Sequence, residues 1–357
     1  MGAYAVVEYT LMALMVVCNL FILVAYAVGR VSRGYNNTLR LPSSGRLVLN
    51  LVLADLLVGV GLCYFSIFKF WPDMAAYLAK YQVPCVLRFA ICFLSMNGSH
   101  CALLVVALDR YIAIVHTLYY KDFMTTRVSW CLILVGWCTP LCGSAALFFV
   151  NEWRPDVPVC DEHHIVPQFL IWFALPSNVF VLLAISVAHW RVHQEVKAFT
   201  RRCADPDFVA SSASRRSYGC RKSAQVLLRM TTTFIVCWTP LDLMLVTMVV
   251  VGPKLWLLVL FEATFLLGMT SFLLNPFMYV WQTEAIRRPL AAALVSLSLL
   301  RPAVLAARGP RGPRGPSSLP RADARSRGVF AITRASVLSV SHSSSSSAHT
   351  TQSSVPP

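Results

Sequence analysis

Seven long apolar stretches constrain the fold of this chain more than any other feature. A helix that crosses a membrane needs about 20 apolar residues, and seven segments meet this requirement, at about 7–29, 46–70, 83–108, 129–150, 165–190, 224–251 and 255–281. Hydrophobic residues make up 57% of the 357 positions and charged residues only 13%, whereas soluble domains carry about 25% charged residues. The sequence therefore predicts an all-α membrane protein, a bundle of seven transmembrane helices.

The distribution of Lys and Arg predicts the orientation of this bundle. Basic residues gather in the loops after the first, third and fifth stretches, and loops of this kind stay in the cytoplasm. We therefore expect an extracellular N-terminus and a multi-pass location in the plasma membrane. The net charge of +15 then reflects topology and suits contact with anionic membrane lipid, so we expect no nucleic-acid partner.

Four segments are expected along the chain. They are a short extracellular N-terminus (1–6), the seven-helix domain (7–282), a short amphipathic cytoplasmic helix on the membrane surface (283–300) and a disordered tail (301–357). The end of the tail is rich in Ser and Thr, a composition typical of disorder. Phosphorylation of these hydroxyls would create a dense anionic patch, and a merely solvated tail is the alternative.

Charged residues inside or at the ends of apolar stretches mark candidate functional positions, because they are costly in a membrane. Asp55 lies well inside the second stretch, and Asp109-Arg110-Tyr111 closes the third. Cys85 stands at the outer end of the third stretch and Cys160 in an outer loop, so both face the oxidising side. A disulfide between them is the favoured interpretation, and two free thiols are the alternative.

Taken together, these residues resemble those of rhodopsin-like (class A) G protein-coupled receptors over roughly residues 10–290. The matching positions, in chain order, are Asn19, Asp55, Cys85, Asp109-Arg110-Tyr111, Trp137, Cys237-Trp238-Thr239-Pro240 and Asn275-Pro276-Phe277-Met278-Tyr279. The resemblance implies a receptor, not an enzyme, that transmits an extracellular ligand signal to heterotrimeric G proteins by outward movement of the sixth helix. The seventh span is faintly similar to the adenosine and lipid-amide receptors, too faintly to indicate a ligand, so the receptor is orphan-like.

The resemblance also implies roles for individual residues. Three groups are expected: a G protein switch, an activation pivot around two helix-kinking prolines, and a polar network that can hold a sodium ion. The switch comprises Asp109, Arg110, Tyr111, Leu118 and Tyr279; the pivot comprises Trp238, Pro240, Asn275 and Pro276; the network comprises Asn19, Asp55, Ser99, Ser271 and Asn275. No other metal or cofactor is expected, and arrestin is expected to bind the phosphorylated tail. A buried Asp55 that is satisfied by water alone remains an alternative.

One departure from the family pattern bears on regulation. The inner end of the sixth helix often carries an acidic residue that restrains the switch arginine, and Cys220 occupies that position here, followed by Arg221 and Lys222. Because the inactive state then lacks one restraint, we predict raised basal signalling. Ser271 and Phe272 replace a usual Asn-Ser pair, which leaves the details of the sodium site open.

The expected ligand pocket lies between the outer halves of the helices. Its candidate lining is Arg88, Phe89, Cys92, Phe93, Met96, Trp172, Trp238, Asp242, Phe261, Glu262 and Phe265. The family's amine receptors have an Asp where Cys92 stands and its opsins a Lys where Met269 stands, which argues against both ligand classes.

Two polar positions of this lining leave the ligand chemistry open. Arg88 would bind an acidic, lipid-like ligand or pair with an outer-loop carboxylate, and Asp242 would accept a hydrogen bond from a ligand. Two other functions remain alternatives: a ligand-independent, constitutively active or modulatory receptor that acts through another membrane protein, and a transporter or channel.

Overall fold

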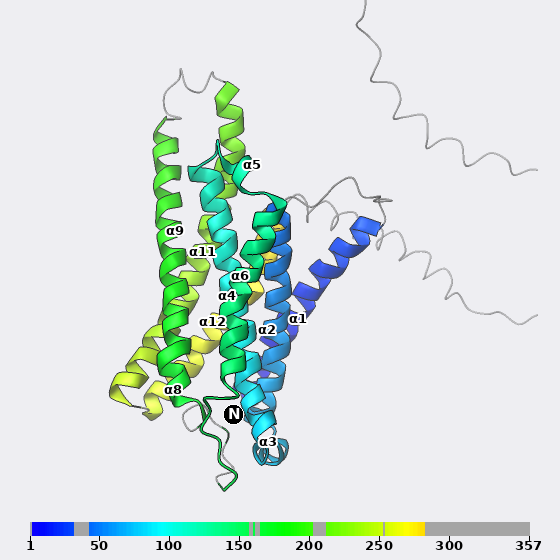
Figure 1. Ribbon diagram of the computed structural model, residues 1–357, viewed down its shortest axis with the longest axis vertical. Helices are drawn as coiled ribbons and strands as arrows, with labels where there is room; N and C mark the ends of the chain where they lie inside the picture. Colours follow the sequence, from blue (N-terminus) through cyan, green and yellow to red (C-terminus); the bar gives the residue numbers. More distant parts are fainter. Residues whose placement is uncertain are drawn as a thin grey trace, which may run out of the picture. The chain divides into compact units, whose positions relative to one another are not determined.

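The protein is described by a computed structural model that covers residues 2–31, 43–156, 160, 165–202, 212–252 and 254–282. Within these residues, seven helices are long and apolar enough to cross a membrane, as Figure 1 shows. They are α1 (Gly2–Val31), α2 (Ser43–Phe70), α4 (Gln82–Val115), α6 (Thr126–Ala146), α9 (Leu175–Arg202, preceded by α8 and η1), α11 (Ser212–Val251) and α12 (Leu255–Gln282). The predicted all-α bundle of seven transmembrane helices is confirmed.

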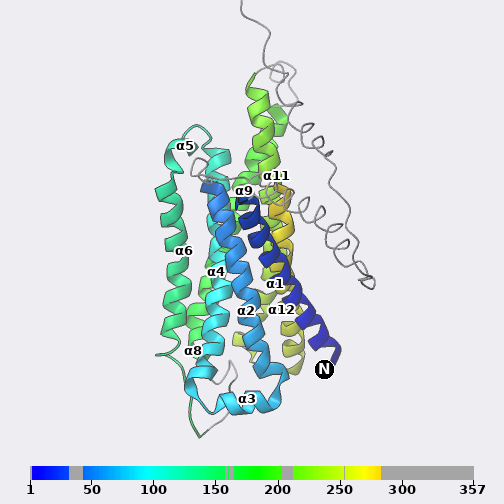
Figure 2. The same cartoon turned by 90° about the vertical axis from the view of Figure 1, so that its right-hand side faces the viewer.

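Short helices lie at the two ends of the bundle. Figure 2 shows α3 (Pro72–Ala79) at one end and α5 (Tyr120–Phe123) at the other. The fifth span begins as α8 (Pro167–Phe169) and continues through a π-helical segment, η1 (Leu170–Ala174), into α9. Such π-helical segments are rare and change the direction of the side chains that follow.

Two helices continue well beyond their predicted apolar stretches. The third stretch was expected to end at residue 108, but α4 continues to Val115, so that Asp109 and Arg110 lie on a continuous helix. The sixth was expected from residue 224, but α11 begins at Ser212. Loss of hydrophobicity marks the membrane edge, whereas a helix continues as long as its backbone hydrogen bonds do. The predicted helix 283–300 and tail 301–357 lie outside the described residues.

Helix α4 is the centre of the bundle. It contacts α2, α6, α9 and α11, and many of its residues are buried. Gly98 allows a close approach to α6, because a Cβ atom at this position would lie 2.7 Å from the ring of Trp137. The indole of Trp137 in turn donates a hydrogen bond of 3.0 Å to Asn50 on α2. Three helices therefore meet at this point.

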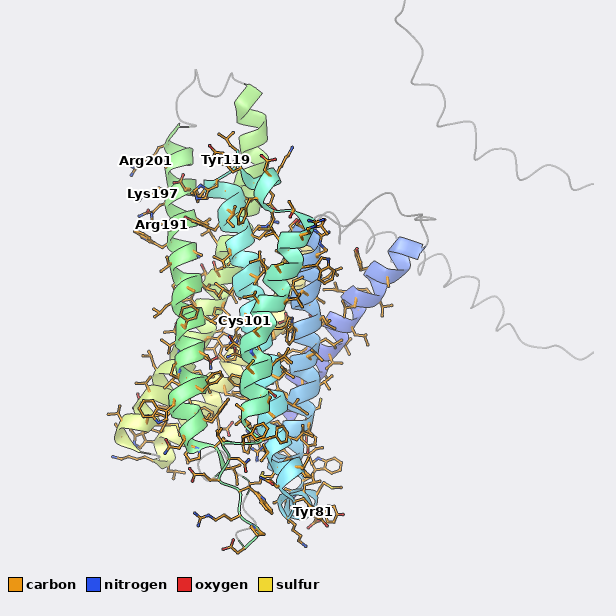
Figure 3. All side chains as sticks on the ribbon, viewed as in Figure 1. Tyr81, Cys101, Tyr119, Arg191, Lys197 and Arg201 are labelled. Carbon is orange, nitrogen blue, oxygen red and sulfur yellow. A yellow bond between two sulfur atoms is a disulfide. The ribbon has the colours of Figure 1, made fainter. Side chains whose placement is uncertain are left out.

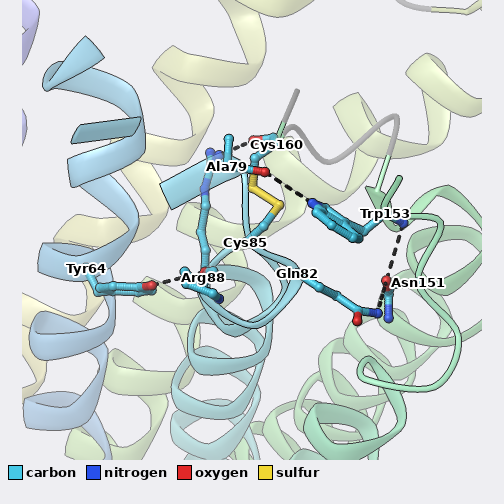
Figure 4. Close-up of a disulfide and its surroundings, with 9 residues drawn as sticks. Tyr64, Ala79, Gln82, Cys85, Arg88, Asn151, Trp153 and Cys160 are labelled. Carbon is cyan, nitrogen blue, oxygen red and sulfur yellow. Dashed lines mark hydrogen bonds between the residues drawn. A yellow bond between two sulfur atoms is a disulfide. The ribbon is translucent and has the colours of Figure 1, made fainter. Parts of the chain in front are cut away.

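A disulfide joins the start of α4 to the loop before α8. The Cys85 and Cys160 sulfur atoms are 2.04 Å apart, which confirms the favoured pairing. Around this bridge the Trp153 indole donates to the Ala79 carbonyl at 3.2 Å, and Gln82 donates to Asn151 at 3.2 Å, as Figure 4 shows. We call this the disulfide end of the bundle and the opposite one the Asp109 end.

Candidate functional site

At the Asp109 end, a buried carboxylate holds the switch arginine. Asp109 is fully buried, and its Oδ2 atom lies 2.6 Å from Arg110 Nη2. Its Oδ1 atom accepts a hydrogen bond of 2.8 Å from the Tyr120 hydroxyl on α5. Burial and the negative charge of Asp109 raise the pKa of the Tyr120 hydroxyl well above its usual value, so the tyrosine remains a donor.

The other predicted switch residues lie around this pair. The Tyr111 ring packs edge-on against His116 with ring centres 6.0 Å apart. Leu118 is 87% exposed, which is the exposure that a side chain inserting into a partner would have. Tyr279 belongs to α12 and Cys220 to α11, but both side chains lie outside the described part of the chain.

The same end of the bundle has basic and histidine side chains on α9. Figure 3 shows Arg191, Lys197 and Arg201 projecting sideways from α9, in the half of this helix nearer to Tyr119. Two residues before Arg191, His189 Nδ1 lies 2.6 Å from the hydroxyl oxygen of Thr231 on α11. This contact joins α9 to α11.

Three of the predicted network residues meet in the middle of the bundle. Asp55 is fully buried. Its carboxylate accepts a hydrogen bond from the Ser99 hydroxyl and another, of 3.1 Å, from the Asn275 amide. Asn19 is also buried, but its amide donates to the Met15 carbonyl of its own helix at 2.9 Å, and its Oδ1 atom has no hydrogen-bond partner among the described residues.

The remaining network residue, Ser271, connects to the pivot. The Trp238 indole donates to the Ser271 hydroxyl at 2.8 Å, and Pro240 lies two residues further along α11. The Trp238 ring also meets His100 on α4 edge-on, with ring centres 4.1 Å apart. His100 was not selected from the sequence, although a histidine in the middle of an apolar stretch is a signal of a functional position. The pivot tryptophan thus links three helices.

Most of the predicted pocket residues lie on the helices expected for them, but they form separate groups. Phe93 packs edge-on against Phe169 with ring centres 5.0 Å apart, and Phe261 stacks on Phe265 at 6.1 Å. Phe89 is buried beside Phe65. Cys92 and Met96 contact each other through their sulfur atoms, 3.7 Å apart.

Asp242 is the polar residue that stands out from this apolar lining. Only 6% of its surface is exposed, and its Oδ1 atom has no hydrogen-bond partner among the described residues. A buried carboxylate without a partner is costly. The position is therefore suited to a hydrogen-bond donor that the protein itself does not supply.

Arg88 lies at the disulfide end and is already engaged. Its Nη1 atom donates to the Cys160 carbonyl at 2.6 Å (Figure 4). The guanidinium group also lies 4.1 Å from the ring centre of Phe65 and 5.0 Å from that of Phe89, which is the geometry of a cation–π interaction. Arg88 therefore supports the loop that carries the disulfide.

Trp172 lies outside the aromatic interior where it was predicted. Its side chain is 76% exposed, and its indole donates to Gln168 at 2.9 Å. The residue belongs to the π-helical segment η1, whose wider turn shifts the side chains away from the positions that an α-helical count gives.

Glu262 belongs to a group of charged and polar side chains that was not predicted from the sequence. We call this group the outer charge cluster, and it consists of Tyr4, Glu8, Lys69 and Glu262. Lys69 Nζ lies 2.7 Å from Glu262 and 3.1 Å from Glu8, and the Tyr4 hydroxyl donates to Glu262. The cluster joins α1, α2 and α12. Glu8 and Lys69 are charged residues within spans, and this signal was available in the sequence.

Comparisons with known proteins agree with this arrangement. The family model "7 transmembrane receptor (rhodopsin family)" matches residues 19–279. Melanocortin receptor 5 of Sus scrofa is 28% identical over 273 residues, covering 72% of this chain and 83% of that receptor. G-protein coupled receptor 12 of Homo sapiens is 25% identical over 267 residues, covering 72% of each chain. The chain therefore belongs to the rhodopsin family of seven-transmembrane receptors and is a G protein-coupled receptor.

Proposed function

We propose that this receptor binds an extracellular ligand in the disulfide-side half of the bundle and activates a heterotrimeric G protein by outward movement of α11. The single observation that carries this proposal is the position of Trp238. It contacts His100 and Ser271 on two neighbouring helices and lies next to Pro240. A proline inside a helix removes a backbone hydrogen bond and permits a kink.

The Asp109 end supports the coupling part of the proposal. The Arg110 guanidinium is paired with Asp109 in this structure and would turn toward the G protein in the active state. The His189–Thr231 contact between α9 and α11 would have to open when α11 moves outward. Both contacts therefore favour the inactive state.

The residue at position 220 supports raised basal activity. This position on α11 is a cysteine, so it supplies no carboxylate to restrain Arg110. A two-state receptor that lacks one inactive-state restraint populates its active state more without a ligand. The same observation is compatible with the second candidate, a receptor that signals constitutively or modulates another membrane protein without a ligand of its own.

The ligand class follows from the polar residues of the pocket. Asp242 offers a buried carboxylate oxygen without a partner, whereas Arg88 is held by the Cys160 carbonyl and by aromatic rings. An apolar ligand with a hydrogen-bond donor, such as an amide N–H or a hydroxyl group, therefore fits better than an acidic one. We expect Asp242 to accept that hydrogen bond.

We also propose a bound ion and further partners. We propose that a sodium ion binds the oxygen atoms of Asp55, Ser99 and Ser271, since hard cations prefer oxygen ligands. We also propose an extracellular N-terminus, a plasma-membrane location, contact with anionic lipid, arrestin binding to the phosphorylated tail, and no enzymatic or nucleic-acid-binding activity.

Nucleotide exchange on purified Gα subunits tests the proposed function. Membranes that contain the receptor should accelerate exchange on at least one Gα family, and Arg110→Ala should abolish the effect. Arg191→Ala, an exposed arginine at the same end, serves as the matched control and should retain exchange. Full activity in Arg110→Ala would contradict the mechanism, and substrate flux without any exchange would favour a transporter or channel.

The same assay tests the ligand site. A ligand that raises exchange through the wild-type receptor should lose most of its potency on Asp242→Asn, which keeps the shape of the side chain but not its charge. An unchanged ligand response in this variant would remove Asp242 from the binding site. Exchange that no ligand alters would favour the ligand-independent candidate.

A further inference from the structure

A cavity of about 490 Å³ lies on the outside of the bundle between α4, α6 and α9, helices that run side by side in Figure 1. Most of its lining is apolar and includes Leu108, Val135, Trp172 and Phe180. Val135, Trp172 and Phe180 are 67%, 76% and 67% exposed, although all three lie in membrane-spanning segments. The cavity therefore opens toward the lipid hydrocarbon, and a molecule dissolved in the bilayer can enter it.

Polar atoms interrupt this apolar wall. Asn97 lines the cavity, and only 2% of its surface is exposed. Its amide nitrogen donates to Ser177 and Asn178, both at 3.1 Å, so its two hydrogens are used. Its oxygen accepts only a weak hydrogen bond from the Cys101 thiol at 3.6 Å. Acceptor capacity is therefore left on the oxygen of Asn97.

Two hydroxyl groups complete the polar part of the wall. The Ser177 hydroxyl uses its hydrogen on the Ala174 carbonyl at 2.8 Å, so that it offers only an acceptor toward the cavity. Thr139 also lines the cavity, and its side chain is exposed toward the membrane. Among the described residues no hydrogen bond involves its hydroxyl group, which can therefore donate. The cavity thus offers one donor and two acceptors, which matches the needs of a hydroxyl group.

The depth of these atoms restricts the ligand further. Asn97 lies 12 residues after Cys85 on α4, which is about 18 Å along the helix axis, near the middle of a hydrocarbon layer of about 30 Å. A plain hydrocarbon chain would leave the polar atoms without partners. The fitting molecule is therefore a lipid whose hydroxyl group lies deep in the membrane.

We propose that this cavity binds a sterol hydroxylated on its side chain. The flat ring system would lie on the aromatic side chain of Trp172, five residues before Ser177, and the side chain would extend from there to mid-membrane. There its hydroxyl group accepts a hydrogen bond from Thr139 and donates one to Ser177 or Asn97. The volume falls within the range of about 300–1,000 Å³ that is typical of small-molecule sites.

Saturation binding of a radiolabelled side-chain-hydroxylated sterol tests the site. The full-length receptor is purified into sterol-free lipid nanodiscs, and cholesterol is the competitor that lacks the second hydroxyl. We expect saturable binding that cholesterol displaces about tenfold more weakly, since it lacks the hydroxyl group that makes both hydrogen bonds. The assay needs no G protein, so its outcome is independent of the proposed function.

Variants of α6 provide matched controls. Val135→Trp fills the cavity and should abolish binding, whereas Leu134→Trp should bind normally, because Leu134 is similarly exposed (65%) but does not line the cavity. Thr139→Val keeps the shape of the side chain and should lower the affinity for the sterol about 2–10-fold. If Val135→Trp fails to fold, the affinity of Thr139→Val tests the proposal in its place. Absence of saturable binding, equal competition by cholesterol, or equal binding to Val135→Trp and Leu134→Trp would each overturn the proposal.

Discussion

The hydroxyl group of Tyr120 donates a hydrogen bond of 2.8 Å to the buried carboxylate of Asp109. Because Asp109 also holds Arg110, the tyrosine fixes the group that keeps the switch arginine in place. The sequence did not indicate this contact. In the switch that we propose, it would restrain Arg110 in addition to the ion pair with Asp109.

Removal of this hydroxyl should raise basal activity. Tyr120→Phe deletes one hydrogen bond to Asp109 and retains the ring. Since a hydrogen bond to a charged group contributes about 1.5–3 kcal/mol, we expect basal nucleotide exchange to rise by about tenfold or more if the receptor is mostly inactive. The neighbouring Tyr119→Phe is the control, because Tyr119 is 71% exposed. Equal basal rates in Tyr120→Phe and the wild type would show that the contact does not restrain Arg110.

The outer charge cluster should contribute to stability. Lys69→Met leaves the carboxylates of Glu8 and Glu262 without their shared cation. Breaking a fully buried pair costs roughly 3–5 kcal/mol, and since Lys69 is partly exposed we expect about 2 kcal/mol, measured as a lower Tm of the purified receptor. Lys80→Met, at an exposed position, should leave the Tm unchanged. A Tm for Lys69→Met that equals that of Lys80→Met would contradict this prediction.

Two glycines of the bundle should respond differently to the same substitution. A Cβ atom at Gly98 would lie 2.7 Å from the Trp137 ring, whereas at Gly136 the nearest atom would be 3.5 Å away, in ordinary contact. Gly98→Ala should therefore destabilise the receptor by about 1–3 kcal/mol, the usual cost of overpacking, and Gly136→Ala should be nearly neutral. Thermal unfolding in detergent compares them, and similar Tm values would show that α4 and α6 separate at little cost.

Sodium should suppress basal exchange through Asp55. If the ion occupies the Asp55, Ser99 and Ser271 oxygens, replacing potassium by sodium at constant ionic strength lowers exchange in the wild type. In Asp55→Asn, which lacks the charge, the two salts should give the same rate. A sodium effect that persists in Asp55→Asn would place the ion elsewhere or remove it from the mechanism.

The sequence predicted the spans well because apolar runs of spanning length leave few alternatives in a membrane. It also predicted the Cys85–Cys160 bridge. The family resemblance grouped Asp55 with Ser99 and Asn275, which the structure joins by hydrogen bonds. The charged contacts of Lys69 were missed, because its partners come from helices at opposite ends of the sequence and no local pattern connects them. A membrane helix is apolar on all sides, so hydrophobicity does not tell which face points inward.

Trp172 shows how this limit acts on one residue. Its aromatic character favoured the pocket, and no amphipathic pattern contradicted that choice. The orientation depends instead on the π-helical turn at Leu170–Ala174, a departure from regular geometry that residue spacing does not reveal. The same reasoning explains why the cavity between α4, α6 and α9 was not predicted.

The position of Pro240 along α11 has a mechanical consequence. From Pro240 the helix extends 28 residues to Ser212 in one direction and 11 residues to Val251 in the other, or about 42 Å and about 16 Å along its axis. The two arms on either side of the proline therefore differ in length by a factor of about 2.5. If α11 bends at Pro240 as we propose, a shift of 1 Å at the short end corresponds to about 2.5 Å at the long end.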